Sequence, residues 1–166
     1  MSNEEILAEI NAAFPEAVVE VPEGCKDFTI VLQADRLVEV AAYLRDQMGM
    51  DYLSSVTAVD HEERLEVVYH LYSMARGGGP LVLKVYLPDK ERPEVPSLTS
   101  LWPGAEFQER EVYDFFGIRF VGHPDLRRIF TWEGFPGHPL RKDFEAEWPL
   151  ETNELVAVKY AAPDNP

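Results

Sequence analysis

Apolar residues recur at helical spacing in two segments of the first fifty residues. The first segment, residues 4–14, has Asn3 as a possible N-cap, and the second, residues 35–48, begins at Asp35 and ends before Gly49. The apolar stripes comprise Ile6, Leu7, Ile10 and Phe14 in the first segment and Leu37, Val40, Ala41, Leu44 and Met48 in the second. The spacing therefore predicts two amphipathic helices.

Runs of β-branched and aromatic residues predict strands between and after these helices. They cover residues 17–21, 28–32, 52–59, 65–74 and 81–87, and turn-forming segments separate several of them. Partial alternation in the run 65–74 predicts a central strand that is covered on both faces. The order α-β(2)-α-β(3) indicates an α+β fold, a two-layer sandwich with a mixed, mostly antiparallel five-stranded sheet, followed by an extended C-terminal arm. The charged, proline-bounded stretch 88–96 is expected to be an exposed loop or hinge.

A third helical stripe precedes Gly117, which is expected to end that helix. Its apolar members are Phe107, Val112, Phe115 and Phe116. On the polar side, Glu106 lies one turn before Arg110, and Arg110 lies one turn before Asp114. The simplest interpretation is a solvated face whose ion pairs contribute about 0.3 to 0.5 kcal/mol each.

Composition excludes several function classes. The chain of 166 residues carries a formal net charge of −15, which argues against a nucleic acid or an anionic membrane surface as the main ligand. No apolar run approaches the ~20 residues of a membrane span, and the acidic N-terminus lacks the pattern of an export signal. The single cysteine, Cys25, fits a reducing compartment, and one thiolate is too few for an iron–sulfur cluster. No glycine-rich pattern for NADH or flavin is present.

Charge divides the chain into three parts. Residues 1–100, the predicted α+β domain, hold 8 basic and 18 acidic residues, a balance of −10. Residues 101–144, the third helix and the arm, hold 6 basic and 7 acidic residues, a balance of −1. Residues 145–166 form an acidic tail with several prolines, too short for a core of its own. The near-neutral middle part is therefore the candidate for a specific function.

Two catalytic interpretations of this middle part have little support. A stand-alone hydrolase could use carboxylates among Glu109, Glu111 and Asp114, but an arginine within one turn of each favours ionisation of all three. A metal site could use His123, Asp125 and His138, or His61 and Glu63, but none of these groups has the tight spacing of known metal motifs. Both His123 and His138 precede a proline, and that setting suits hydrogen bonding to a carbonyl at least as well.

Protein recognition is the interpretation that composition favours. Residues 101–144 contain five arginines, one lysine and ten aromatic residues, a bias typical of interfaces. Arg127 and Arg128 are suited to pairing with carboxylates of a partner. The open alternative is that the aromatic side chains fold back on the domain's own sheet, and we favour partner docking over it.

One string in this region resembles a family signature. The segment EREVYDFFGIRFVGHPDLRRIF, residues 109–130, resembles the motif of the C subunit of the proton-pumping NADH:quinone oxidoreductase, the thirty-kilodalton subunit of respiratory complex I. The segment GHPLRKDF, residues 137–144, resembles the family's downstream element. The positions that the resemblance marks as partner-binding are Glu109, Arg110, Glu111, Asp114, Phe115, Phe116, His123, Arg127, Arg128, Ile129, Phe130, Pro139, Leu140, Arg141, Lys142 and Asp143.

The resemblance implies a structural role without a catalytic centre, cofactor or metal on this chain. In that family the subunit packs against the subunit that forms the quinone cavity and against iron–sulfur subunits, so clusters, FMN, NADH and quinone are expected on partners. The resemblance also implies a peripheral position on the cytoplasmic side of the cell membrane. An equivalent subunit of a membrane-bound hydrogenase or another complex I-like enzyme remains an alternative.

Overall fold

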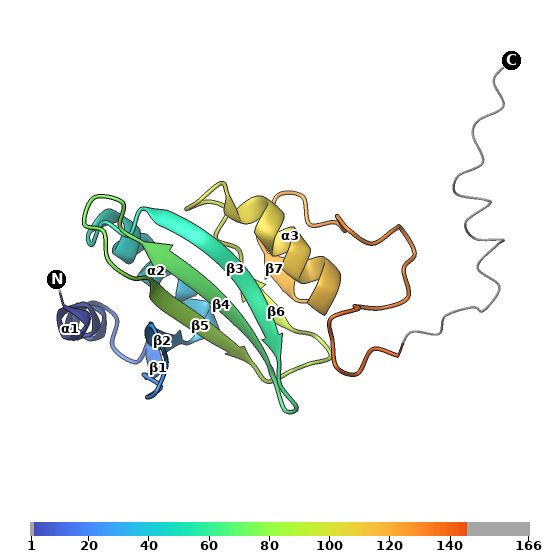
Figure 1. Cartoon of the computed structure of the whole chain (residues 1–166), viewed down its shortest axis with the longest axis horizontal. Helices are drawn as coiled ribbons and strands as arrows, with labels where there is room; N and C mark the ends of the chain where they lie inside the picture. Colours follow the sequence, from blue (N-terminus) through green and yellow to red (C-terminus); the bar gives the residue numbers. More distant parts are fainter. Residues whose placement is uncertain (1, 146–166) are drawn as a thin grey trace, which may run out of the picture.

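A five-stranded sheet forms the centre of the computed structural model, which describes residues 2–145 (Figure 1). The strands are β1 (Val18–Glu20), β2 (Phe28–Leu32), β3 (Tyr52–Asp60), β4 (Leu65–Tyr72) and β5 (Leu81–Leu87). They lie in the order β1-β2-β5-β4-β3, and only the β2–β5 pairing is parallel. The predicted mixed, mostly antiparallel sheet is therefore confirmed.

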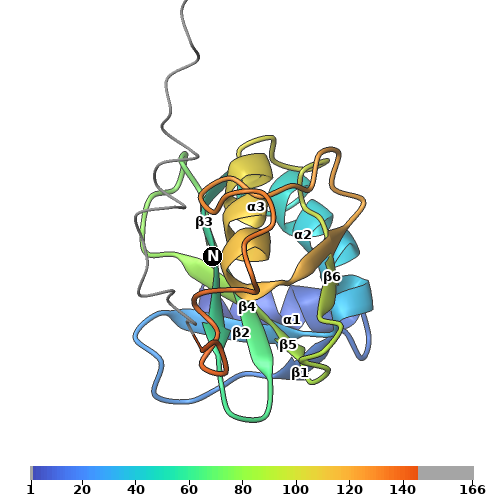
Figure 2. The ribbon, with the colours of Figure 1, turned by 90° about the vertical axis from the view of Figure 1, so that its right-hand side faces the viewer.

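Helices cover one face of this sheet. Helices α1 (Asn3–Ala13), α2 (Leu37–Asp46) and α3 (Ala105–Phe116) contribute to the same hydrophobic core as the inward-facing residues of the strands, and Figure 2 shows α2 and α3 on the same side of the sheet. The two-layer α+β sandwich is confirmed. Among the described residues, no helix is long and apolar enough to cross a bilayer.

The predicted helix starts need correction. Helix α1 is capped by Ser2, because the Ser2 hydroxyl accepts from the Glu5 N–H while the Glu5 carboxylate accepts from the Ser2 N–H. Asp35 caps nothing, since it lies inside a short 3-10 helix (Ala34–Arg36) that leads directly into α2. Gly49 does adopt the left-handed conformation expected beyond a helix end.

The interior strand β4 is buried on both faces. Leu65, Val67, Tyr69 and Leu71 point into the helix-covered core. On the opposite face, the Glu66 carboxylate is buried beneath the side chains of Arg64 and Lys84. The expected two-sided burial is confirmed for this strand, although long cationic side chains provide part of the cover.

The stretch 88–96 is not simply an exposed loop. Its end forms strand β6 (Glu94–Pro96), which pairs in parallel with β7 (Arg119–Val121), a strand that the sequence patterns did not predict. Val95 and Phe120 of this pair are buried in the main core. These strands escaped prediction because each has only three residues and α3 separates the two partners in the sequence. The core thus continues past residue 100.

Candidate protein-interaction site

The polar side of α3 is buried. Glu109, Arg110 and Asp114 are nearly inaccessible to solvent, whereas Glu111 is exposed. The expected solvated face with pairs along the helix is therefore wrong for these three residues. The physical reason is that two segments outside the helix, residues 97–98 and 127–131, lie over this side and supply hydrogen-bond partners.

Asp114 organises the segment that follows β7. Its Oδ2 accepts the N–H groups of Ile129, Phe130 and Thr131 at 3.0, 2.7 and 3.0 Å. Its Oδ1 accepts from the Thr131 hydroxyl and from Arg128 Nη1, the latter at 3.0 Å. Burial alone would raise the pKa of Asp114, but these donors outweigh burial and hold the pKa far below its ordinary range. One ionised carboxylate thus fixes the backbone of residues 129–131.

Arg110 completes this attachment from the same helix. Its Nε donates to the Arg127 carbonyl at 3.1 Å, and its Nη2 donates to the Arg128 carbonyl at 3.4 Å. Asp114 and Arg110 therefore hold the N–H and C=O groups of one continuous loop. The structure also shows that the two adjacent arginines differ: Arg128 pairs with Asp114 inside the chain, while Arg127 is exposed and contacts Asp125 at 2.8 Å.

Glu109 binds a different segment. Its carboxylate accepts from the Ser97 hydroxyl at 2.6 Å and from the Leu98 N–H at 2.7 Å. Burial raises the pKa of Glu109 in spite of these bonds, which is opposite in direction to the effect expected from the flanking arginines. Glu109 and Asp114 bind separate segments and Glu111 faces solvent, so the three do not form the carboxylate pair that a hydrolase would need.

The histidines after α3 bind backbone carbonyls. His123 Nε2 lies 3.0 Å from the Glu106 carbonyl oxygen, and His138 Nδ1 lies 2.9 Å from the Asp114 carbonyl oxygen. His61 lies 3.2 Å from the buried Glu66 carboxylate. Within residues 2–145, no group of three or more potential ligands is arranged to hold a metal ion. The carbonyl contacts of His123 and His138 agree with the turn geometry that the proline following each of them favours.

The second motif block returns to the sheet. The Lys142 N–H donates to Asp60 Oδ2 at 2.7 Å, and the Lys90 ammonium pairs with Asp60 Oδ1 at 2.6 Å. Arg141 donates to the Lys90 carbonyl at 2.8 Å and pairs with Asp143. Residues 122–145, in orange in Figure 2, follow β7 and contain no helix or strand. We call this segment the arm, and the hydrogen bonds described above attach its backbone to its own domain.

Large apolar side chains of the arm nevertheless remain exposed. They are Ile129, Phe130, Trp132 and Leu140. Phe130 stacks on Phe115 of α3 with ring centroids 5.3 Å apart, and Trp132 packs edge-on against Phe135 at 4.7 Å. Phe116, in contrast, belongs to the core. The backbone N–H of Leu140 donates a hydrogen bond to the Phe115 carbonyl, which fixes the position of Leu140. A rigidly attached loop thus presents aromatic surface outward, an arrangement typical of interaction sites.

Sequence patterns missed several participants in this site, among them Asp60, Lys90 and Thr131. Asp60 and Lys90 lie far from the motif in sequence, and no periodicity marks a residue that an incoming segment will contact. Thr131 directly follows the signature, and its hydroxyl and N–H both bind Asp114. The useful signal was the alternation of β3, which places the carboxylate of Asp60 on the buried side.

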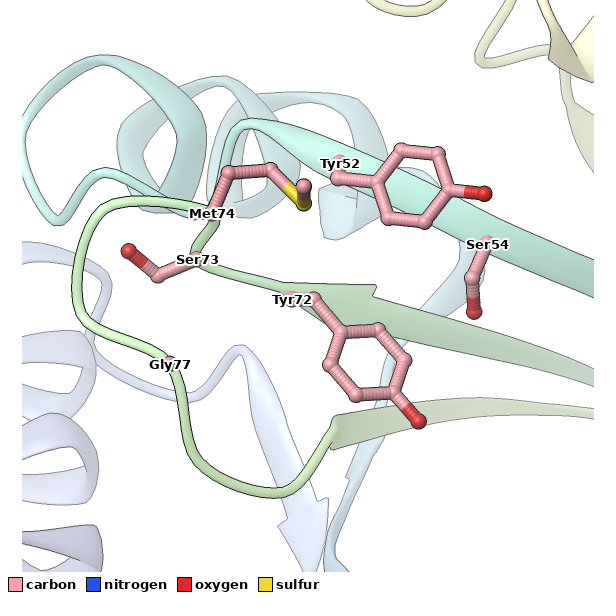
Figure 3. Close-up of a pocket in the computed structure, with 6 residues that line it drawn as sticks. All are labelled: Tyr52, Ser54, Tyr72, Ser73, Met74 and Gly77. Carbon is pink, nitrogen blue, oxygen red and sulfur yellow. The ribbon is translucent and has the colours of Figure 1, made fainter.

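A shallow hollow lies at the other end of the β3–β4 pair (Figure 3). It is lined by Tyr52, Ser54, Tyr72, Ser73, Met74 and Gly77. Tyr52 pairs with Tyr72 at one end of the ladder, whereas Asp60, which receives the arm, pairs with Leu65 at the other. The hollow is therefore separate from the arm.

Comparisons with known proteins connect this architecture to a family. Residues 30–149 match the family described as respiratory-chain NADH dehydrogenase, 30 Kd subunit. The C subunit of the NADH-quinone oxidoreductase of Moorella thermoacetica is 46% identical over 143 residues, covering 85% of this chain and 94% of the relative. The corresponding subunit of Roseiflexus sp. is 43% identical over 161 residues, covering 94% of this chain and 89% of the relative.

Solved structures show the same fold. The trypsin-resistant fragment (1–134) of Nqo5 superposes with a TM-score of 0.61 at 36% identity, covering 76% of this chain and 100% of the fragment. A chain of the membrane-bound sulfane sulfur reductase, an archaeal respiratory membrane complex, superposes with a TM-score of 0.71 at 27% identity, covering 97% of this chain and 92% of that one. From its fold, its motif geometry and these relatives, the chain belongs to the 30 kDa subunit family of the respiratory-chain NADH dehydrogenase.

Proposed function

We propose that this chain is a non-redox structural subunit in the peripheral arm of a proton-pumping NADH:quinone oxidoreductase. It braces the subunit that forms the quinone cavity and the neighbouring iron–sulfur subunits, which carry the clusters, FMN, NADH and quinone sites. It sits on the cytoplasmic side of the membrane and is held there through the complex. Its effect on turnover is to keep electron-transfer distances and cavity shape constant.

One observation carries this proposal: the arm is fixed to its own domain by buried polar contacts while its aromatic side chains face outward. Asp114 holds the backbone at Phe130 and Asp60 holds it at Lys142, while the side chains of Phe130 and Trp132 are exposed. A surface that is rigid before binding loses little conformational entropy on association, which suits a brace. The relatives named as subunits of respiratory complexes support the same role.

A charge reversal at Arg127 tests the proposal. Arg127 is the better target of the two adjacent arginines, because Arg128 pairs with Asp114 and its loss would disturb the arm itself. Arg127→Glu should reduce complex assembly and NADH:quinone reductase activity together, because a partner's carboxylates would be repelled. Native electrophoresis and quinone reduction by the membranes are the measurements.

Arg119→Glu is a matched control. The side chains of Arg127 and Arg119 are 67% and 65% exposed, and each pairs with one carboxylate, of Asp125 and Glu94 respectively, at 2.8 Å. The control should assemble and turn over normally. An Arg127→Glu complex that assembles fully and turns over normally would contradict the bracing role.

A second candidate is the equivalent subunit of a complex I-like enzyme with another electron donor. The likeness to the sulfane sulfur reductase chain favours this candidate, because the superposition covers 97% of this protein at a TM-score of 0.71. Mild detergent extraction of the native complex separates the two candidates. Co-purification of NADH-oxidising subunits supports the NADH-linked enzyme, and a complex that contains none of them supports the relative.

A further inference from the structure

The outward face of α3 carries an aromatic stripe that the other described residues cover only in part. Phe107, Glu111 and Phe115 are spaced at i, i+4 and i+8, so they lie on one face of the helix. Phe107 is 60% exposed, and Phe130, stacked on Phe115, is 63% exposed. The stripe thus runs along the helix and continues onto the arm.

The base of this stripe is rigid. Arg110 lies beneath it, with its guanidinium 5.7 Å from the centre of the Phe107 ring and its donors on the arm carbonyls. The N–H of Phe130 is held by Asp114 at 2.7 Å. Both aromatic ends of the stripe are therefore anchored to buried, hydrogen-bonded charges, and a partner would meet a preformed surface.

Glu111 gives the stripe its electrostatic character. It is an exposed carboxylate between two aromatic side chains, and within residues 2–145 it makes no ion pair or side-chain hydrogen bond. A partner that covered Phe107 and Phe115 with apolar atoms alone would strip water from this carboxylate and leave it unpaired, which is unfavourable. The occupant should therefore bring a polar partner for this carboxylate to the middle of its apolar face, and a cation forms the strongest such pair.

We propose that this stripe docks an amphipathic segment of another subunit in which apolar side chains flank an arginine or lysine. The apolar residues pack on Phe107, Phe115 and Phe130, and the cation pairs with Glu111. This inference rests on the proposed function, because it names the chemistry of one of the braced partners. It adds Phe107 to the positions that the resemblance marks as partner-binding, and it assigns the partner's chemistry at Glu111.

Photo-cross-linking within the assembled complex tests the occupant. With p-benzoylphenylalanine in place of Phe107, irradiation of the purified complex should trap a peptide of another subunit, and mass spectrometry should place a basic residue among apolar ones in it. A second copy of this chain, a peptide without a basic residue, or no cross-link in a fully assembled complex would each overturn the proposal.

Charge exchange tests the pairing independently. Glu111→Lys should weaken retention of the chain in the complex about tenfold, and reversing the trapped basic residue should restore it. Glu63→Lys, an exposed glutamate in the turn between β3 and β4, should have no effect. Restoration supports the pairing, while failure to weaken or to restore overturns it.

These outcomes are separable from failure of the bracing role. If Arg127→Glu abolishes assembly while Glu111→Lys does not, the brace stands and the α3 stripe is wrong. If neither variant affects assembly or turnover, both proposals fall. Thermal unfolding of each purified chain confirms that the variants are folded before they are compared.

Discussion

The two buried carboxylates of α3 have opposite electrostatic settings. Asp114 receives three backbone N–H groups, a hydroxyl and a guanidinium, so its charged form is stabilised in spite of burial. Glu109 receives one hydroxyl and one N–H, and burial prevails. Burial and, after it, the nearby Glu109 carboxylate raise the pKa of the Tyr69 hydroxyl. The number of donors, rather than nearby arginines on the helix, decides the pKa of each carboxyl.

Removing the charge of Asp114 should destabilise the protein. Asp114→Asn leaves Arg128 and several buried N–H groups without an anionic acceptor, and we expect unfolding free energy to fall by about 3 kcal/mol. Urea denaturation measures the loss, and hydrogen exchange should accelerate at residues 129–131. Asp125→Asn, which removes an exposed ion pair, should leave the unfolding free energy nearly unchanged. Equal effects of the two variants would contradict the role assigned to Asp114.

The raised pKa of Glu109 predicts a pH dependence of defined sign. A carboxyl whose folded-state pKa lies above its ordinary value of 4.5 favours folding when protonated, and this contribution is lost as pH rises through the folded-state pKa. Glu109→Gln should therefore gain stability relative to the native chain as pH rises from about 4.5 towards neutrality. Urea denaturation across that range is the measurement. If the unfolding free energy of Glu109→Gln, relative to that of the native chain, falls as pH rises, the prediction is refuted.

At the scale of elements, the end of α3 and the arm depend on one another. Gly117 ends the helix with a positive φ of 76°, and its missing side chain lets the His138 ring approach. A Cβ at this position would lie 2.6 Å from His138 Cδ2, well inside contact distance. The same glycine thus supplies the helix stop that the sequence predicted and a packing site that it did not.

A pair of glycine substitutions separates these two roles. Gly117→Ala introduces both left-handed strain and the clash with His138, whereas Gly24→Ala, at φ 77° with open space around it, introduces strain alone. We expect a loss of about 1 kcal/mol for Gly24→Ala and a further loss of about 1 to 3 kcal/mol for Gly117→Ala. Urea denaturation gives both values, and equal losses would show that the His138 contact contributes nothing.

At the scale of the whole molecule, the arm is a segment of irregular backbone that buried carboxylates hold at two separate places, in addition to the carbonyl contacts of His138 and the Leu140 N–H. One attachment is the Asp114 loop on α3, and the other joins Lys142 and Lys90 to Asp60 on the sheet. The donors at Asp60 outweigh the effect of burial and lower its pKa. Such buried polar contacts fix the position of a loop that buries too little apolar surface to be ordered by packing alone.

Independent attachments should fail independently. Asp60→Asn should speed hydrogen exchange at Lys142 and leave residues 129–131 protected, while Asp114→Asn should do the reverse. The double variant should expose both parts of the arm, with β4 and β5 remaining protected because their amides belong to the central sheet. Mass-resolved hydrogen exchange distinguishes these cases. Loss of protection across the whole arm in either single variant would show one cooperative unit instead.

The residue patterns alone determined the order of helices and strands, the mixed sheet, the end of α3 at Gly117 and the family signature. These features depend on local periodicity, turn chemistry and a contiguous motif, all of which can be read along the chain. The segment 146–166, including nearly all of the predicted acidic tail, lies outside the described residues.

Tertiary structure alone decided which charges of α3 are buried and what they bind. From the sequence, Glu109, Arg110 and Asp114 read as charged residues on an exposed helix face. They are buried only because residues 97–98 and 127–131 pack over the helix. The short strands β6 and β7 and the Asp60 attachment likewise depend on partners 25 or more positions away. Long-range contacts of this kind leave no local periodicity, because either partner alone would be an ordinary polar or loop residue.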